Sequence, residues 1–577
     1  MVSAAASPDS NAAPGSTRRG LAFARLAAIC GGTCNWTAAS AAIAALALLP
    51  VAALAVIAIG GPADTWRHLA ANVLPATVPV TLMLLAGVAL LVIVVGAGTA
   101  WLVAAYDFPA RQIFDWALLL PLAVPTYVVA FAYLDMLHPL GPVQGALRAL
   151  LGITDPRDFR LPDIRSLPGA ILLFGLVLYP YVYLTTRALF LMQASGIMDA
   201  ARILGASGID LLRRVVLPLA RPAIAVGVSL ALMETLNDVG ASEFLGIRTL
   251  TLSIYATWIN QSNLPGAAGL ALAMLAIVVM LVIAERMGRR ARRFTATSQR
   301  SHPPRRRRLA GGAAWLAFAA AATPVALGFI LPSVHLAIAA ARRIAFAGIA
   351  PDIMTTVLNT LAISAIATLV AITCGLVTAF AARIAGGRTA TALARTATLG
   401  YALPGTVLAI GLLFPLAAVD NALNDVARAH FGVATGLLIT GSGAALVLAY
   451  VVRFLAISTG GIEAGFDKVP RSLDESARVL GRRPGGVLAA VHLPLLRPAL
   501  AAAAILVFVD CMKELPATLL LRPLNFETLA TLLYGEAVRG TYEDGALAAL
   551  AIVAAGLLPV VLLARIGRSP IEASRTP

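Results

Sequence analysis

The sequence predicts an all-α membrane protein of about 12 transmembrane helices in two parallel six-helix repeats. Of its 577 residues, 59% are hydrophobic and only 12% are charged, about half the charged share of soluble domains. The apolar residues form long runs, many of them reaching the roughly 20 residues that a spanning helix needs. Unbroken runs of this length exclude a β-barrel, whose strands alternate. The repeat shows in a polar stretch, DAARILGASGIDLLRRVVLPLARP, which returns as ESARVLGRRPGGVLAAVHLPLLRP with 11 of 24 positions identical.

The expected spans divide into two groups of six. The apolar run from about Trp36 to Ile59 is too long for the core of a signal peptide, so we interpret it as an uncleaved first span. The other spans of the first half are expected near 77–104, 117–137, 169–192, 223–245 and 266–284. Those of the second half are expected near 312–340, 357–383, 395–418, 434–457, 499–521 and 546–566. This gives a first repeat at 1–284, a basic linker at 285–311 and a second repeat at 312–577.

The arginines indicate the sidedness of the chain. The net charge is +16, and most of the arginine falls in loops that lie on one side if the spans alternate. The positive-inside rule places that side, with both termini, in the cytoplasm. The ten arginines of Glu285–Arg308 are read as a linker that fixes topology, in preference to a nucleic-acid or anionic-lipid patch. The four cysteines and six histidines show no ligand spacing, so no metal or cofactor is expected.

The repeat extends beyond the polar stretches. LAVPTYVVAF corresponds to YALPGTVLAI, which aligns Pro125 with Pro404. Thr249-Leu250 followed by Tyr255 corresponds to Thr528-Leu529 followed by Tyr534. Two parallel repeats pack about a pseudo-twofold axis along the membrane normal, with a substrate path between them.

We call the two polar stretches, Asp199–Pro222 and Glu475–Pro498, the islands. Each island is expected to form a short helix with its acidic residue at the start, where a negative charge suits the helix dipole. A turn follows, and the chain enters a span at Leu-Pro. Gly205 and Gly481 suit a tight turn or the close approach of another backbone. The proline is expected to break the chain before the membrane helix.

At this point the sequence resembles the membrane subunits of binding-protein-dependent ABC importers. Their cytoplasmic loop carries Glu-Ala-Ala, three residues, Gly, nine residues and Ile-x-Leu-Pro, and both islands match that spacing with mild substitutions. The resemblance implies that the islands couple to ATP-binding subunits through Asp199, Ala200, Ala201, Gly205, Leu217, Pro218, Glu475, Ser476, Ala477, Gly481, Leu493 and Pro494. It implies two copies of the ATP-binding subunit, one for each island, and a soluble binding protein outside.

The chain itself is expected to be a transport subunit and not an enzyme. A P-loop needs Gly-Lys-Ser/Thr, whereas the two lysines, Lys468 and Lys513, follow Asp467 and Met512. The ATPase is therefore expected to be a separate chain. The alternative from another class is an ion-driven secondary transporter, which gives no reason for two matched docking loops.

Four carboxylates in apolar segments indicate the path, since charges inside a membrane are costly and often functional. Glu234 and Asp238 align with Asp510 and Glu514 across the repeat. Spacing of i,i+4 is expected to place each pair on one helix face, and by symmetry all four converge. We interpret them as lining the path of a cation, because hard cations prefer oxygen ligands. The alternative is a structural polar network or gate in which Lys513 neutralises one carboxylate.

A narrower resemblance concerns the cargo. KELPATLLLRPLNFETLA, ETLNDVGASEFLGIRTLTLSIYATW and PARQIFDWALLLPLAVPTYVVAFAYLDML are similar to the fused two-domain permeases of ferric-iron importers. The resemblance implies a multi-pass protein of a bacterial inner membrane that carries ferric iron. Related fused permeases carry thiamine or 2-aminoethylphosphonate, so these cargoes remain alternatives.

Overall fold

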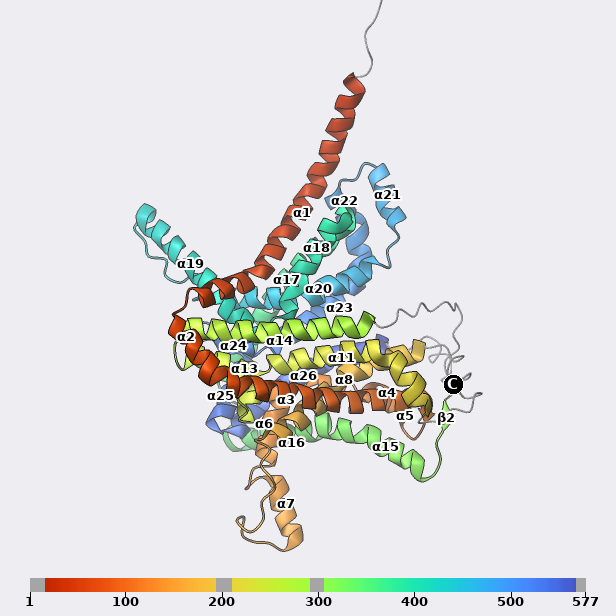
Figure 1. Ribbon diagram of the computed structural model, residues 1–577, viewed down its shortest axis with the longest axis vertical. Helices are drawn as coiled ribbons and strands as arrows, with labels where there is room; N and C mark the ends of the chain where they lie inside the picture. The colour runs from red at the N-terminus through yellow and green to blue at the C-terminus, as the bar shows by residue number, and fades with distance from the viewer. Residues whose placement is uncertain (1–15, 193–209, 291–305, 567–577) are drawn as a thin grey trace, which may run out of the picture. The chain divides into compact units, whose positions relative to one another are not determined.

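The computed structural model describes residues 16–192, 210–290 and 306–566, and almost all of them are helical (Figure 1). Eleven of the described helices are long and apolar enough to cross a membrane. A further pair, Arg111–Ala123 and Thr126–Met136, is bent by 88° and makes a twelfth span if it counts as one. The predicted fold class is therefore confirmed.

The elements follow the chain in two comparable series. The first half contains α1 (Ser16–Ile59), α2 (Ala63–His68), α3 (Leu74–Val92), α4 (Gly98–Ala105), β1 (Tyr106–Asp107), α5 (Arg111–Ala117), α6 (Thr126–Met136), α7 (Pro142–Leu151), α8 (Leu167–Met192), α11 (Leu217–Asn237), α12 (Val239–Phe244), α13 (Leu250–Ile259) and α14 (Leu264–Arg290). The second half contains β2 (Arg307–Arg308), α15 (Gly312–Val325), α16 (Leu331–Ala347), α17 (Asp352–Ala385), α18 (Gly387–Ala397), α19 (Gly405–Phe431), α20 (Ala444–Phe466), α21 (Arg471–Val479), α22 (Pro484–Val487), α23 (Leu493–Met512), α24 (Pro516–Leu521), α25 (Leu529–Arg539) and α26 (Tyr542–Ile566). The two strands pair in parallel, Tyr106 with Arg307 and Asp107 with Arg308.

Short π-helical and 3-10 turns interrupt these helices. The π turns among the described residues are η1 (Leu69–Val73), η2 (Ile93–Ala97), η4 (Leu211–Val216), η5 (Ala326–Ile330) and η7 (Leu488–His492), and the 3-10 turns are η3 (Leu120–Ala123) and η6 (Thr398–Ala402). Four of these π turns run directly into a Leu-Pro pair: η1, η4, η5 and η7. Proline has no N–H to donate one turn back and its ring crowds that carbonyl, so the helix widens locally to a π turn instead of stopping.

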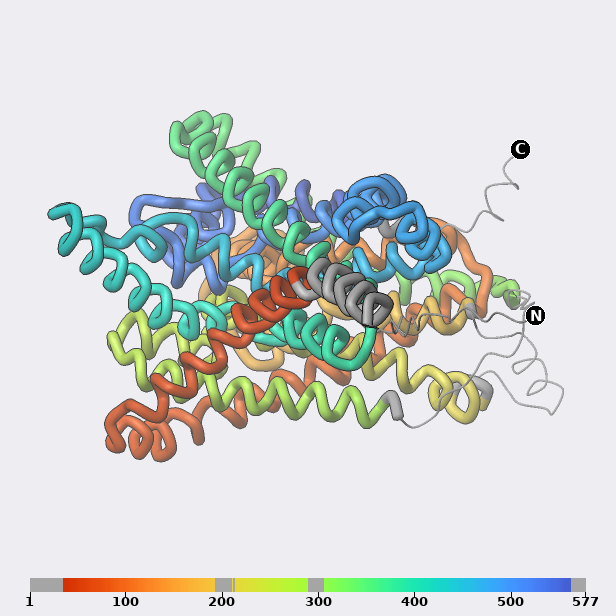
Figure 2. The backbone as a smooth tube through the Cα atoms, turned by 90° about the horizontal axis from the view of Figure 1, so that it is seen from above, coloured from red at the N-terminus to blue at the C-terminus, as the bar shows by residue number. Residues whose placement is uncertain are grey.

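The described chain divides into two compact units. The first unit comprises residues 1–47, 372–399 and 455–503, and the second comprises 48–371, 400–454 and 504–577. In the first unit the aromatic rings of Phe380 and Phe466 pack with His492 and, at the edge, Trp36. In the second unit a continuous apolar core joins helices of both repeats; α3, α11 and α14 run side by side in it (Figures 1 and 2).

The internal repeat is visible inside the second unit. Pro125 and Pro404 are the N-cap residues of α6 and α19, with nearly the same backbone angles, φ −59°, ψ 148° and φ −58°, ψ 146°. A 3-10 turn, η3 or η6, precedes each proline. Thr249 and Thr528 each cap the helix that follows, α13 or α25, through their side-chain oxygen.

Five expected spans differ clearly from those observed. The third span, expected at 117–137, is the bent pair, because the chain leaves the helical conformation at Val124 before Pro125. The fifth, expected to reach 245, ends at Asn237. The ninth, expected at 395–418, lies at Gly405–Phe431, because the chain leaves the helical conformation before Pro404. The tenth, expected at 434–457, lies at Ala444–Phe466. The eleventh, expected at 499–521, runs from Pro484 to Met512. It starts early because Pro494 widens the helix and does not break it, so the end of the second island is already part of the membrane helix.

Candidate functional site

The candidate site lies in the second unit, where α11 and α23 end. Asp238 follows α11 in extended backbone (φ −83°, ψ 101°), and its carboxylate accepts a hydrogen bond of 2.8 Å from the N–H of Ala241. Glu514 follows α23, and its carboxylate accepts from the N–H groups of Ala517 and Thr518, both at 3.1 Å. In each repeat this carboxylate satisfies the free N–H groups of a new six-residue helix, α12 or α24.

These caps correct one prediction from the sequence. The pairs Glu234–Asp238 and Asp510–Glu514 were expected to share one face of a continuous helix, but the helix ends between the two members of each pair. Glu234 and Asp510 lie in the last turn of α11 and α23. Their partners lie beyond the break and point into the same space by capping the next helix.

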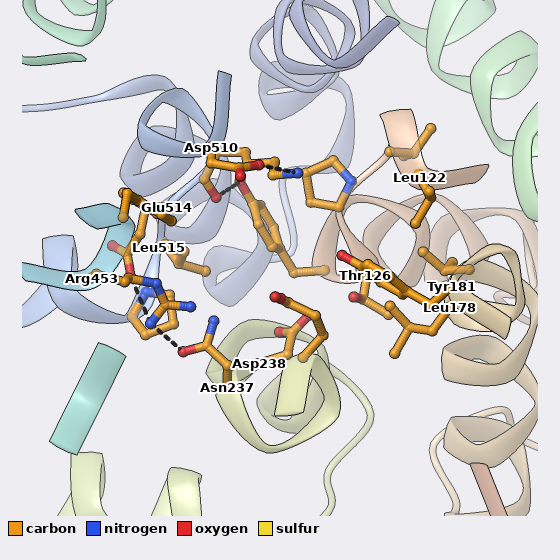
Figure 3. Close-up of a pocket in the computed structure, with 18 of the residues that line it drawn as sticks. Leu122, Thr126, Leu178, Tyr181, Asn237, Asp238, Arg453, Asp510, Glu514 and Leu515 are labelled. Carbon is orange, nitrogen blue, oxygen red and sulfur yellow. Dashed lines mark hydrogen bonds and ion pairs between the residues drawn. The ribbon is translucent and has the colours of Figure 1, made fainter. Parts of the chain in front are cut away.

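All four carboxylates nevertheless line one cavity of about 100 Å³ (Figure 3). The residues that supply its polar lining are Glu234, Asn237, Asp238, Asp510, Glu514, Arg453, Lys513, Thr126, Tyr127, Tyr181 and Tyr401. The cavity exceeds the roughly 10–15 Å³ that one water molecule needs. It therefore has room for a small ion with some of its water.

The charges around the cavity are only partly balanced. Lys513 Nζ lies 2.8 Å from Asp510 Oδ1, and Arg453 Nη1 lies 3.8 Å from Glu514 Oε1. Glu234 accepts a hydrogen bond of 3.3 Å from the hydroxyl of Tyr401. Four carboxylates face two cationic side chains, so an ionised lining carries two negative charges in excess.

Polar contacts across the repeats hold the lining in place. Asn237 Oδ1 accepts from Arg453 Nη1 at 2.8 Å and from the Gly405 N–H at 2.7 Å. A Cβ atom at position 405 would lie 2.6 Å from Glu514 Oε1, so a larger residue there would push the carboxylate aside. The Tyr127 hydroxyl donates to the carbonyl of Lys513 at 3.2 Å.

Arg453, Asn237 and Gly405 were not identified from the sequence. Arg453 stands in the apolar run LVLAYVVRFLAI, so the rule that selected the carboxylates could have selected it as well. Asn237 and Gly405 give no comparable signal, because an uncharged amide and a glycine are ordinary residues in membrane helices.

The second island has the predicted order of helix, turn and membrane helix, all within the described residues. Its helix α21 begins at Arg471, so Glu475 lies exposed in the middle of the helix, contrary to the expectation that it opens the helix. Ser476 is exposed and Ala477 is buried. Leu493 and Pro494 begin α23.

Gly481 ends α21 in a left-handed conformation, with φ +81°. Its N–H bonds the carbonyl of Arg478, and the N–H of Arg482 bonds that of Ala477, the pattern of a Schellman motif. A Cβ at position 481 would meet no atom within 4 Å. The turn, and not a close backbone contact within this chain, therefore accounts for the glycine.

The first island lies largely outside the described residues, which resume at position 210. Asp199, Ala200, Ala201 and Gly205 fall in the part not described. Leu217 and Pro218 begin α11 directly after the π turn η4, as Leu493 and Pro494 do after η7.

A buried ionic network lies under α21 in the first unit and was not predicted. Arg383, near the end of α17, donates to Asp474 Oδ2 at 2.8 Å and to the carbonyls of Phe466 and Val469 at 2.7 and 2.9 Å. Asp474 Oδ1 also lies 2.9 Å from Nε2 of the fully buried His492. The network fixes the inner face of α21 to the membrane helices beside it.

Similarity to known proteins also falls into two parts of the chain. Residues 93–293 and 371–568 each match the family described as "Binding-protein-dependent transport system inner membrane component". The Fe(3+)-transport system permease protein FbpB 2 of Haemophilus influenzae is 24% identical over 486 residues, 84% of this chain and 88% of the relative.

Two further relatives match over one part of the chain. The sulfate transport system permease protein CysW of Escherichia coli is 34% identical over 164 residues, 28% of this chain and 53% of the relative. The putative 2-aminoethylphosphonate transport system permease protein PhnU of Salmonella paratyphi A is 30% identical over 169 residues, 29% of this chain and 57% of the relative. Together, the duplicated family match over more than half of the chain and the many apolar helices show that it belongs to the binding-protein-dependent transport system inner membrane components, as a multi-pass ABC importer permease with two fused repeats.

Proposed function

We propose that this permease carries ferric iron and that Glu234, Asp238, Asp510 and Glu514 line its path. The observation that carries the proposal is the cavity into which both repeats direct two carboxylates each. Ferric iron is a hard cation, and carboxylate oxygens are the ligands that such ions prefer. The Haemophilus relative, which is named for Fe(3+) transport, spans most of the chain.

The charge balance favours a cation over an anion. Sulfate and 2-aminoethylphosphonate carry anionic groups, and an anion in this cavity would need Lys513 or Arg453 as its partner. Both are already placed against carboxylates, at 2.8 and 3.8 Å. An anion would have to displace those contacts and then meet the remaining carboxylates at short range, where like charges repel strongly.

The islands supply the coupling to ATP in this proposal. One ATP-binding subunit docks on each island in the cytoplasm, and a loaded binding protein docks on the opposite side. α11 begins at Leu217-Pro218 and carries Glu234, and α23 begins at Leu493-Pro494 and carries Asp510. A displacement of either island is therefore passed along a single helix to a cavity carboxylate. The repeats are assigned to 1–284 and 312–577, joined by the cytoplasmic linker 285–311, with both termini in the cytoplasm.

The test is uptake of radioactive ferric iron into vesicles that contain the permease, its ATP-binding subunits and its binding protein. We expect ATP-dependent uptake that excess thiamine, 2-aminoethylphosphonate or sulfate does not inhibit. Changing Gly205 and Gly481 together to leucine is expected to abolish uptake, because leucine is strained at φ +81° in the turn at Gly481 and the sequence predicts an equivalent turn at Gly205. ATP-dependent uptake of one of the competitors in place of iron would overturn the cargo, and uptake without the ATP-binding subunits would overturn the coupling.

A further inference from the structure

Two tyrosines that the repeat aligns, Tyr255 and Tyr534, meet beside the cavity and take no part in the path described above. Each lies six residues after the threonine that caps its helix, α13 or α25. Their ring centroids are 6.4 Å apart with the rings nearly perpendicular. Each repeat thus contributes one tyrosine to the same place.

A carboxylate completes this group. The Tyr534 hydroxyl donates a hydrogen bond to Oε2 of Glu243, in α12, and the Phe244 ring stacks on Tyr534 with centroids 5.8 Å apart. Tyr534 is 8% exposed, whereas Tyr255 and Glu243 are half-buried. A carboxylate and two phenol side chains from three different helices therefore meet at a partly exposed place.

Glu243 and the two tyrosines lie close to the carboxylate cavity. α12 starts at the cavity residue Asp238 and ends next to Glu243, a rise of about 8 Å along the helix. In the second unit, α13 and α25 lie at the end of the bundle where α14 and α26 begin, away from β2 (Figure 1). On the sidedness that the arginines predict, this is the outer end.

We propose that Glu243, Tyr255 and Tyr534 form an outer binding site for a trivalent hard cation, which receives ferric iron before it enters the carboxylate cavity. This inference rests on the proposed function. Among the described residues, no group of three or more His, Cys, Asp or Glu is placed to hold a metal ion, the cavity carboxylates included; the site proposed here differs by using two phenol oxygens. Phenolate oxygen is an established ligand of iron in proteins.

The charge count fits a trivalent ion. When Fe3+ binds, each phenol loses its proton to water, and two phenolates with one carboxylate supply three negative charges. The Fe–O bonds replace the hydrogen bond between Tyr534 and Glu243, and the site becomes neutral. A divalent ion at the same ligands would leave one charge uncompensated in a partly buried place, which is unfavourable.

The test is the spectrum of the full-length permease in lipid nanodiscs, titrated with ferric nitrilotriacetate. An iron–phenolate bond gives a charge-transfer band in the visible region, which carboxylates alone do not give. We expect this band to saturate at one iron per chain. Tyr255→Phe and Tyr534→Phe are expected to abolish it, and Glu243→Gln to weaken binding by about tenfold or more. Tyr133→Phe is the matched control, because Tyr133 is a buried tyrosine that donates to the Leu327 carbonyl, and it should keep the band.

Resonance Raman scattering from the wild-type chain gives a second readout that does not depend on any variant folding, because tyrosinate vibrations identify the ligand directly. Absence of the band and of these vibrations at saturating iron, or a band that survives in the double Tyr255→Phe/Tyr534→Phe variant, would overturn the site. Iron uptake without the band would remove this site and leave the proposed function standing. A band in a permease that takes up no iron would support the site and count against the proposed function.

Discussion

Removal of the Arg383 side chain should release the second island from the membrane helices. Arg383 and Asp474 expose only 9% and 12% of their side chains, and Arg383 also donates to two backbone carbonyls. Arg383→Met keeps the volume of the buried stem but leaves the carboxylate without its guanidinium. Breaking a buried ion pair in this way costs about 3–5 kcal/mol.

The local measurement is amide hydrogen exchange along α21, which reports the free energy of opening. A loss of about 3–5 kcal/mol corresponds to an increase in exchange of about two to nearly four orders of magnitude, up to the rate of an unprotected helix. Arg388→Met, an exposed arginine of α18, is the matched control and should leave exchange unchanged.

A double variant tests whether the unpaired carboxylate causes the opening. Arg383→Met combined with Asp474→Asn removes the uncompensated buried charge, so we expect exchange to return part of the way to the wild-type rate. Exchange in Arg383→Met within about twofold of wild type, or a double variant that is additive with the single ones, would show that the pair does not anchor α21.

Two further predictions follow from the backbone. Gly481→Ala should destabilise the end of α21 by about 1 kcal/mol or more, because alanine is strained at φ +81°. Gly486→Ala in the α22 helix should be neutral or stabilising. Thermal unfolding of the purified permease distinguishes the two variants, and equal effects would contradict the assignment of the turn. Thr81→Val and Thr360→Val should each lower the free energy of unfolding by about 1–3 kcal/mol, because each hydroxyl accepts a hydrogen bond from the first N–H of α13 or α25. Markedly unequal decreases in stability would argue against the equivalence of the two repeats.

The sequence located the cavity carboxylates because two independent signals coincided on them. A charge in an apolar segment is rare, and the repeat aligned Glu234 with Asp510 and Asp238 with Glu514. The cavity places all four together. Their roles in transport remain a prediction.

The helix ends between the paired carboxylates were predictable in one repeat only. Pro516 crowds the carbonyl of Met512, where α23 ends, so the sequence held a signal in the second half. No proline stands at the equivalent place in the first half. There the break coincides with a hydrogen bond from the Ala241 N–H to the Asp238 carboxylate. Such side-chain-to-backbone bonds compete with a continuous helix, and the residue type alone does not decide between the two.

The anchor of α21 was beyond prediction for a different reason. Arg383 and Asp474 lie 91 residues apart in the chain, on helices whose packing no periodicity specifies. Arginines near the ends of spans are also common, because they fix topology. Only the fold distinguishes Arg383 from Arg388.

The most direct test of the proposed path removes the charges of two cavity carboxylates while it keeps the shapes of their side chains. In vesicles with the complete transporter, Glu234→Gln combined with Asp510→Asn should abolish ATP-dependent uptake of ferric iron, while the loaded binding protein still stimulates ATP hydrolysis. Glu463→Gln, an exposed carboxylate on α20 outside the cavity, should transport normally. Normal iron uptake by the double variant with intact ATPase stimulation would contradict the claim that these carboxylates line the path.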